Sequence, residues 1–161
     1  MKENMVTTEE FVAILDLMAR YTHAIDNDRL EDWVECFTEV CDYKIITLEN
    51  VQQALEAGML TCNSRAMLKD RVAYIRKAAV FNVHRDRHIV GHPLVRRTGD
   101  GTFEATSGFT VHQSEPERES RLFAVGYYED VIVREGGVLK FRSRTAVLEN
   151  NSIKPLLSSP I

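Results

Sequence analysis

Three histidines and an aspartate lie within nine residues of one another, at His84, Asp86, His88 and His92. Two histidines with one carboxylate are ligands of non-haem iron, and side chains two residues apart on a strand share a face. His84, Asp86 and His88 could therefore converge on a metal ion. Four arginines lie among or near these residues, and their positive charge opposes a divalent cation. The four are Arg85, Arg87, Arg96 and Arg97.

We favour a different interpretation of this segment. Arg85, Asp86, Arg87 and His88 would form a buried, hydrogen-bonded network that fixes the sheet or a subunit contact. Such a network needs the same residue types as a metal site but gains stability from the arginines, whereas a metal site is weakened by them.

A second charged group lies nearer the end of the sequence. Arg142 and Arg144 are expected on one face of a strand, and Asp130, with Glu129, on the strand before it. Opposite charges on neighbouring antiparallel strands form cross-strand ion pairs. Because arginine is enriched at interfaces, some of these residues could instead contact a partner subunit.

The three cysteines, Cys36, Cys41 and Cys62, form no Cys-x-x-Cys motif, which indicates free thiols in a reducing compartment. Residues 1–8 are polar and do not resemble a signal peptide, so we expect a cytoplasmic protein. A Rieske [2Fe–2S] cluster needs two cysteines and two histidines. No histidine lies within ten residues of any cysteine, so this chain is not expected to bind that cluster, and no other cofactor is predicted.

The overall composition suits one globular domain covering residues 1–161. The chain has 161 residues, 44% hydrophobic and 27% charged, and a net charge of −4. Nucleic acids and anionic membranes attract basic surfaces, so this mildly acidic chain is a poor candidate for binding either. No apolar run approaches the roughly eighteen residues of a membrane span.

Helical patterns fill the first half of the sequence. Thr7 and Glu10 have the spacing of a capping box, and apolar residues then recur every three or four positions until about residue 27. Further helices are expected at 30–37, at 50–57 up to Gly58, and at 64–78 with Ser64 as the N-cap.

Strand patterns fill the second half, after a short strand at 43–47. Strands are expected at 87–97, with Pro93 interrupting the pairing, and then at 103–114, 120–134 and 138–149, joined by short turns. Helices followed by strands indicate an α+β fold. We predict a curved antiparallel sheet wrapped around about three N-terminal helices, a cone whose interior can be a pocket.

Four stretches of the sequence carry a resemblance to a known family. They are residues 21–37, the Leu-x-Asp-Arg pattern at 68–71, the Arg-x-Arg-His pattern at 85–88, and residues 123–130 followed by 140–144. In this order and spacing, the chain resembles the small (beta) subunits of aromatic-ring-hydroxylating dioxygenases, within the nuclear-transport-factor-2-like (NTF2-like, SnoaL-like) superfamily. The resemblance covers nearly the whole chain.

This resemblance implies a cone-shaped, non-catalytic subunit in the catabolism of aromatic compounds. The large (alpha) subunit would hold the Rieske [2Fe–2S] cluster and the mononuclear iron, and this chain would pack beneath it as a trimer within an α3β3 assembly. Gly91-His92-Pro93 replaces the asparagine found in many beta subunits. In this respect the chain resembles the subgroup of beta subunits whose oxygenases act on carboxylated rings such as salicylate, anthranilate or terephthalate.

The same superfamily suggests an alternative function. Its small dehydratases and isomerases use an aspartate and a histidine in the cone as general acid and base, so Asp26 and His88 could act in this way. Tyr21, Tyr43 and Tyr127 would then position a substrate. Otherwise, Asp26 ends a helix and the tyrosines belong to the core.

The apolar, proline-containing segment 153–161 is expected to pack against a neighbouring subunit, because a monomer gains little from exposing it.

Overall fold

The structure is a computed structural model that describes residues 5–79, 83–98, 101–150 and 159–161. The described residues form four helices and seven strands, in an order close to that expected. The helices are α1 (Thr8–Asp26), α2 (Leu30–Val34), α3 (Leu48–Gln52) and α4 (Arg65–Lys77). The strands are β1 (Phe37–Thr47), β2 (Leu60–Cys62), β3 (Arg85–Val90), β4 (Leu94–Arg97), β5 (Phe103–Ser114), β6 (Arg121–Glu135) and β7 (Val138–Leu148).

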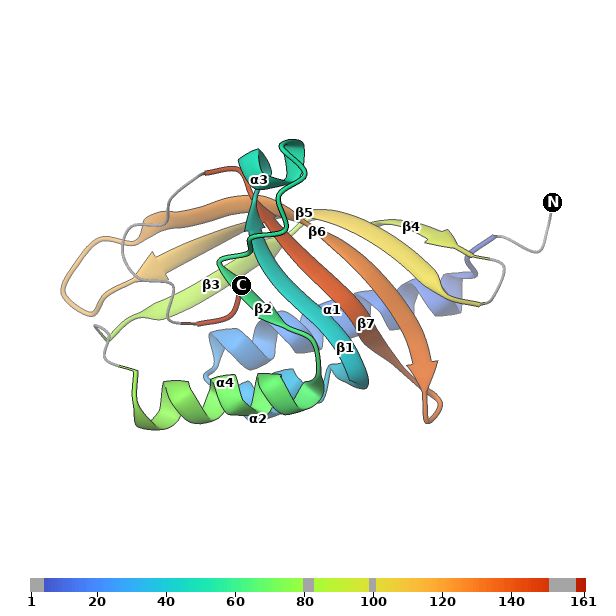
Figure 1. Ribbon diagram of the computed structural model, residues 1–161, viewed down its shortest axis with the longest axis horizontal. Coiled ribbons are helices and arrows are strands. Elements are labelled where there is room, and N and C mark those ends of the chain that lie inside the picture. Colours follow the sequence, from blue (N-terminus) through green and yellow to red (C-terminus); the bar gives the residue numbers. More distant parts are fainter. Residues whose placement is uncertain (1–4, 80–82, 99–100, 151–158) are drawn as a thin grey trace.

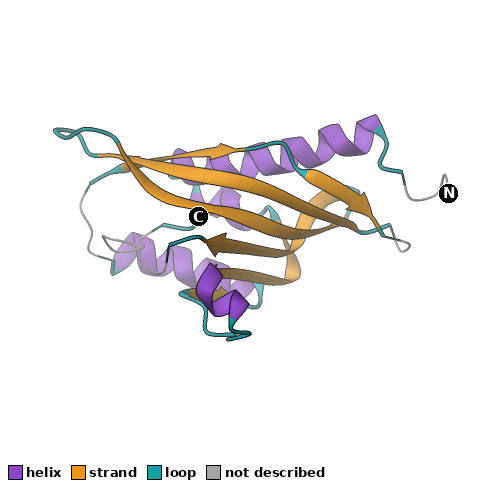
Figure 2. Ribbon diagram, turned by 90° about the horizontal axis from the view of Figure 1, so that it is seen from above, coloured by secondary structure: helices purple, strands orange, loops and turns teal. Residues whose placement is uncertain are grey.

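The strands form a single curved sheet that covers a layer of helices (Figures 1 and 2). The strand order is β2-β1-β7-β6-β5-β3, with β4 also paired to β5. Helix α1 packs against β3 and β7, and α4 packs against β1 and β2. Helices α1, α2 and α4 lie on the same side of the sheet, whereas α3 lies beyond the end of β1 (Figure 1). The expected α+β cone is therefore confirmed.

One strand pairing departs from the antiparallel arrangement predicted. Strands β1 and β7 run parallel, with Tyr43 beside Arg144 and Thr47 beside Leu148. The remaining pairs in the described sheet are antiparallel. Parallel neighbours need a long connection, and here that connection is most of the domain. The chain leaves β1, forms α4 and the β3–β6 meander, and returns in β7.

The helix ends follow the signals in the sequence. Thr7 forms the expected capping box: its hydroxyl accepts from the backbone of Glu10, and the Glu10 carboxylate accepts from the backbone of Thr7. Ser64 caps α4 by accepting from the backbone of Met67. Helix α3 begins earlier than predicted because Thr47 acts as its N-cap, and it ends at Gln52, before Ala54 adopts a φ of 52°.

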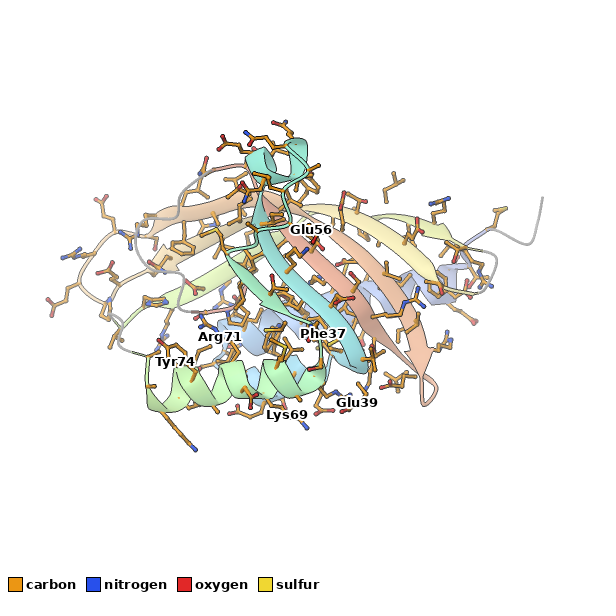
Figure 3. All side chains as sticks on the ribbon, viewed as in Figure 1. Phe37, Glu39, Glu56, Lys69, Arg71 and Tyr74 are labelled. Carbon is orange, nitrogen blue, oxygen red and sulfur yellow. The ribbon has the colours of Figure 1, made fainter. Side chains whose placement is uncertain are left out.

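Strand β1 is longer than predicted and begins at Phe37, so α2 is correspondingly shorter. Phe37 points into the helix layer, where it makes edge-to-face contacts with Trp33 of α2 and Tyr21 of α1 (Figure 3). Pro93 lies between β3 and β4, confirming the predicted interruption. The core therefore lies between the concave face of the sheet and the three covering helices.

Candidate functional site

Asp26 and His88, the proposed acid–base pair, are brought together at the junction of α1 and β3. His88 Nδ1 lies 2.6 Å from Asp26 Oδ1, and the His88 backbone N–H donates to Asp26 Oδ2 at 3.0 Å. The His88 side chain is fully buried, and that of Asp26 is 4% exposed. An ionised carboxylate only accepts hydrogen bonds, so Nδ1 is the donor in this contact. Nε2 is buried and has no hydrogen-bond partner among the described residues.

The two tyrosines expected beside this pair make other contacts. The hydroxyls of Tyr21 and Tyr43 lie 3.4 Å apart and donate to the backbone oxygen of Ile161, at 2.5 and 2.9 Å. Burial raises the pKa of both phenols above the usual value, so they remain neutral donors. At this point the chain itself, through Ile161, fills the cone interior, which can be a pocket in this fold.

Tyr128, not Tyr127, is the β6 tyrosine that faces the core. Tyr128 is fully buried, stacks on Phe109 with ring centroids 4.2 Å apart, and pairs across the sheet with Ser107. Tyr127 lies on the outer face and is partly exposed. Alternate residues of β6 are buried, namely Ala124, Gly126, Tyr128 and Asp130. The period of two along a strand therefore indicates that Tyr128 rather than Tyr127 faces the core.

Asp130 and Arg144 form a buried ion pair inside the cone, as a cross-strand pairing predicts. The guanidinium makes two parallel hydrogen bonds to the carboxylate, both 2.7 Å long, and both side chains are fully buried. The guanidinium carbon also lies 4.0–4.2 Å from the ring centroids of Tyr21, Tyr128 and Phe141. Burial raises the pKa of the Asp130 carboxyl, an effect that Arg144 opposes.

Arg142 was predicted to share a face with Arg144, and that prediction is wrong. The β6–β7 register pairs Val131 with Ser143 and then Ile132 with Phe141, so Arg142 sits at an irregularity between the two pairs. A bulge of this kind turns the following side chains over. Arg142 is consequently exposed, while Arg144 is buried.

The predicted network of Arg85, Asp86, Arg87 and His88 divides into two parts. Arg87 lies 3.6 Å from the Asp26 carboxylate, beside His88. Asp86 instead accepts from Gln113 at 3.1 Å and lies 3.6 Å from His84. Arg85 is exposed. Within the described residues, no group of three or more histidine, cysteine, aspartate or glutamate side chains could hold a metal ion.

A hollow of about 630 Å³ opens beside the Asp26–His88 pair. Asp26, Arg76, Arg87 and Ser159 are among the residues that line it, so charged side chains of both signs face the solvent there. Ser159 connects this wall to Ile161 in the interior, which is 2% exposed. The prediction that segment 153–161 packs against another subunit is therefore wrong for Ile161, and residues 153–158 lie outside the described part of the chain.

Comparisons with known proteins agree with this fold. The model of the SnoaL-like domain family matches residues 6–145. The chain is 34% identical to the anthranilate 1,2-dioxygenase small subunit of Burkholderia cepacia, over 90% of each chain. It is 32% identical to subunit beta 1 of the terephthalate 1,2-dioxygenase terminal oxygenase component of a Comamonas species, over 93% of this chain and 97% of that one.

A solved structure gives the same assignment. The beta subunit of a candidate aromatic-ring-hydroxylating dioxygenase from Novosphingobium aromaticivorans superimposes with a TM-score of 0.84 at 35% identity, covering 93% of this chain and 95% of that one. The fold of this chain is thus the SnoaL-like cone. The chain belongs to the small (beta) subunits of aromatic-ring-hydroxylating dioxygenases. No helix in the described ranges is long and apolar enough to cross a membrane.

Proposed function

We propose that this chain is the non-catalytic beta subunit of the terminal oxygenase component of a Rieske non-haem iron dioxygenase. The observation that carries the proposal is its similarity to a dioxygenase small subunit over nine-tenths of both chains. The filled interior supports a structural role, because the hydroxyls of Tyr21 and Tyr43 donate hydrogen bonds to Ile161 and the charge of Arg144 is balanced by Asp130.

The partner is the large subunit, which holds the Rieske [2Fe–2S] cluster and the mononuclear iron. The donor set of this chain supports that division: its three cysteines are free, buried thiols. Three copies of each subunit form an α3β3 assembly in the cytoplasm, where such thiols stay reduced. The substrate class is a carboxylated aromatic ring, as the names of the anthranilate and terephthalate relatives suggest.

Exposed arginines are the side chains available for contact with the partner. Arg85, Arg87 and Arg142 are exposed, and arginine is favoured at subunit interfaces because its planar fork binds carboxylates in pairs. The remaining members of the predicted set, Asp86, His88, Asp130 and Arg144, are not exposed, and their role is to fix the sheet.

Co-expression with the large subunit of the same oxygenase tests the proposal. We expect the two chains to co-elute in size-exclusion chromatography as a brown complex, and this chain alone to be colourless. The variant Arg142→Glu should weaken co-elution, whereas Lys69→Glu, a matched charge reversal on the exposed face of α4, should leave it unchanged. If wild-type chains elute separately, the proposal is wrong.

A second candidate is a stand-alone dehydratase or isomerase, favoured by one observation. The Asp26–His88 pair is buried, in short contact, and leaves Nε2 unpartnered within the described chain, the arrangement that a general base requires. This candidate predicts turnover of a hydroxylated cyclic substrate by the purified chain alone, lost in Asp26→Asn with folding retained. Turnover that survives this substitution would exclude the pair as its cause.

A further inference from the structure

Helix α3 and the loop that follows it expose apolar side chains that the domain does not cover. None of the five residues of α3 is buried, and every residue in the range 51–59 is exposed. Val51, Leu55 and Met59, each four residues from the next, are 41%, 48% and 43% exposed. The segment lies beyond the end of β1, away from the helix layer (Figure 1). These three side chains form an apolar surface, which we call the α3 surface.

Polar contacts, rather than burial of these side chains, hold the segment in shape. The backbone N–H of Leu55 donates to the backbone oxygen of Asn50 at 2.8 Å, and Asn50 Nδ2 donates to the backbone oxygen of Ala57 at 2.7 Å. Ala54 adopts a φ of 52°, which is uncommon for a residue other than glycine. The apolar side chains are therefore presented on a fixed backbone, which lowers the entropic cost of binding another molecule.

An apolar groove lies at a different place on the molecule, between the beginning of α1 and β4. Its volume is about 430 Å³, and most of its lining residues are apolar, namely Val6, Phe11, Pro93, Leu94 and Val95. Leu94 is 81% exposed. The ring of His92 stacks on that of Phe11 with centroids 6.4 Å apart, so the Gly91-His92-Pro93 stretch helps to form one wall. We call this site the β4 groove. Exposed apolar patches of this kind mark interaction surfaces.

Opposite charges lie beside the two surfaces. Residues 45–64 contain Glu49 and Glu56 but no lysine or arginine, and Glu56 is exposed. On β4, Arg96 lies two residues from Leu94 on the same face, and its side chain is 73% exposed. Arg96 pairs with Glu104, but an exposed ion pair contributes little stability, so the guanidinium can bind a second carboxylate. An apolar segment with acidic neighbours thus matches an apolar groove with a basic neighbour.

From this complementarity we infer that the α3 surface of one chain docks in the β4 groove of a second copy of the chain, with Glu56 beside Arg96. Apolar side chains within a charged rim are typical of subunit interfaces. Because the two surfaces differ, the contact is heterologous, and each copy donates one α3 surface and receives another. Such contacts close into a ring or continue as a fibre. A ring of three rests on the proposed α3β3 assembly, whereas the contact itself does not.

Sedimentation velocity of the purified chain, without the large subunit, tests the contact. We expect the wild type to have three times the 18.4 kDa mass of one chain. Leu55→Glu and Leu94→Glu should each be monomeric, because each places a carboxylate in an apolar interface. Both leucines are exposed in the single chain, so both variants should fold, as circular dichroism can verify. Leu122→Glu, the matched control at a 57% exposed leucine of β6 outside both surfaces, should remain trimeric.

Mixing the two monomeric variants gives the sharper result. Leu94→Glu retains an intact α3 surface, and Leu55→Glu retains an intact β4 groove. The mixture should therefore form a dimer with one chain of each variant and grow no further. Should either variant fail to fold, Glu56→Arg and Arg96→Glu replace them. Each of these should weaken association at least about tenfold through like-charge repulsion, and the double variant should regain the wild-type mass.

Several results would overturn the inference. A monomeric wild type would do so, and so would a wild-type dimer, because a contact between unlike surfaces does not stop at two copies. A trimeric Leu55→Glu or Leu94→Glu, or a mixture that forms no dimer, would also refute it. If Leu55→Glu stays trimeric but no longer co-elutes with the large subunit, the large subunit covers α3, and the proposed function stands without this contact. A trimer with the expected variant behaviour that does not bind the large subunit would instead refute the proposed function alone.

Discussion

Breaking the buried pair of Asp130 and Arg144 should destabilise the domain far more than removing both charges together. In Arg144→Met the carboxylate keeps its buried position but loses both 2.7 Å hydrogen bonds. In Asp130→Leu the guanidinium loses its counter-ion. Removing one partner of a buried ion pair costs about 3–5 kcal/mol, a large part of the roughly 5–15 kcal/mol by which a domain is stable.

The aromatic surroundings make the two single variants unequal. After Asp130→Leu, the guanidinium still lies over Tyr21, Tyr128 and Phe141, and a desolvated cation–π contact contributes about 2 kcal/mol. This loss should therefore lie near the lower limit of about 3 kcal/mol. The double variant replaces the pair by apolar side chains and should lose less free energy of unfolding than either single variant, giving a coupling energy of at least about 3 kcal/mol.

The pH dependence of Arg144→Met has a definite sign. Burial already raises the pKa of Asp130 in the folded protein, and Arg144 opposes that rise. Without the guanidinium, the folded pKa moves further above the unfolded value. A raised folded pKa stabilises the protein below the unfolded pKa, and this contribution is lost as the pH rises through the folded pKa. The deficit of Arg144→Met relative to wild type should therefore be smaller at acidic pH than at neutral pH.

Urea unfolding followed by fluorescence of Trp33, the single tryptophan of the chain, measures all four proteins. The reasoning is refuted if the two single losses add up, within about 0.5 kcal/mol, to the loss in the double variant. It is also refuted if the deficit of Arg144→Met grows as the pH falls. Either result would mean that the carboxylate and the guanidinium are not energetically coupled in the folded protein.

Three further predictions concern the fold. Gly126→Ala should lower the free energy of unfolding by about 1–3 kcal/mol, because the added Cβ would lie 2.0 Å from a backbone oxygen of β7. Gly108→Ala, whose added Cβ would have its nearest contact at 4.0 Å, should change the free energy of unfolding little. Urea titration of the two variants compares these losses. Cys36 and Cys41, whose pKa burial raises to about 11, should react with Ellman's reagent only after unfolding, and fast reaction of the native protein would contradict this. Thr7→Ala should cost about 1 kcal/mol by removing half of the capping box, visible as a lower melting temperature by circular dichroism.

Local signals in the sequence were sufficient to predict most of the elements. The capping box at Thr7 and the cap at Ser64 depend on residues three positions apart, and the interruption at Pro93 depends on one residue. The parallel pairing of β1 with β7 was not predictable in this way, because it joins segments about a hundred residues apart. The first half of β1 was also not predicted, because buried and exposed residues do not alternate before Cys41.

The candidate site divides in the same way. Opposite charges in neighbouring strands predicted the pairing of Asp130 with Arg144. The position of Arg142 could not be predicted, because a bulge changes which face a residue occupies without a distinctive sequence. The pairing of Asp26 with His88 came from the family resemblance rather than from any spacing, since 62 residues separate the two.

The Asp26–His88 pair illustrates why a catalytic arrangement and a structural one can have the same appearance. Asp26 is the last residue of α1, and its carboxylate accepts from both the ring and the backbone N–H of His88 while Arg87 lies nearby. A carboxylate used in this way fastens the end of a helix to the sheet and is stabilising without any reaction. The same two hydrogen bonds would also hold the imidazole as a base. The contacts within the pair are therefore the same whether Asp26 and His88 have a structural role or act as an acid–base pair. What separates the two roles is whether a substrate can reach Nε2. In the described structure His88 Nε2 is buried, and the cone interior contains buried aromatic side chains and Ile161, which supports the supporting role that we propose.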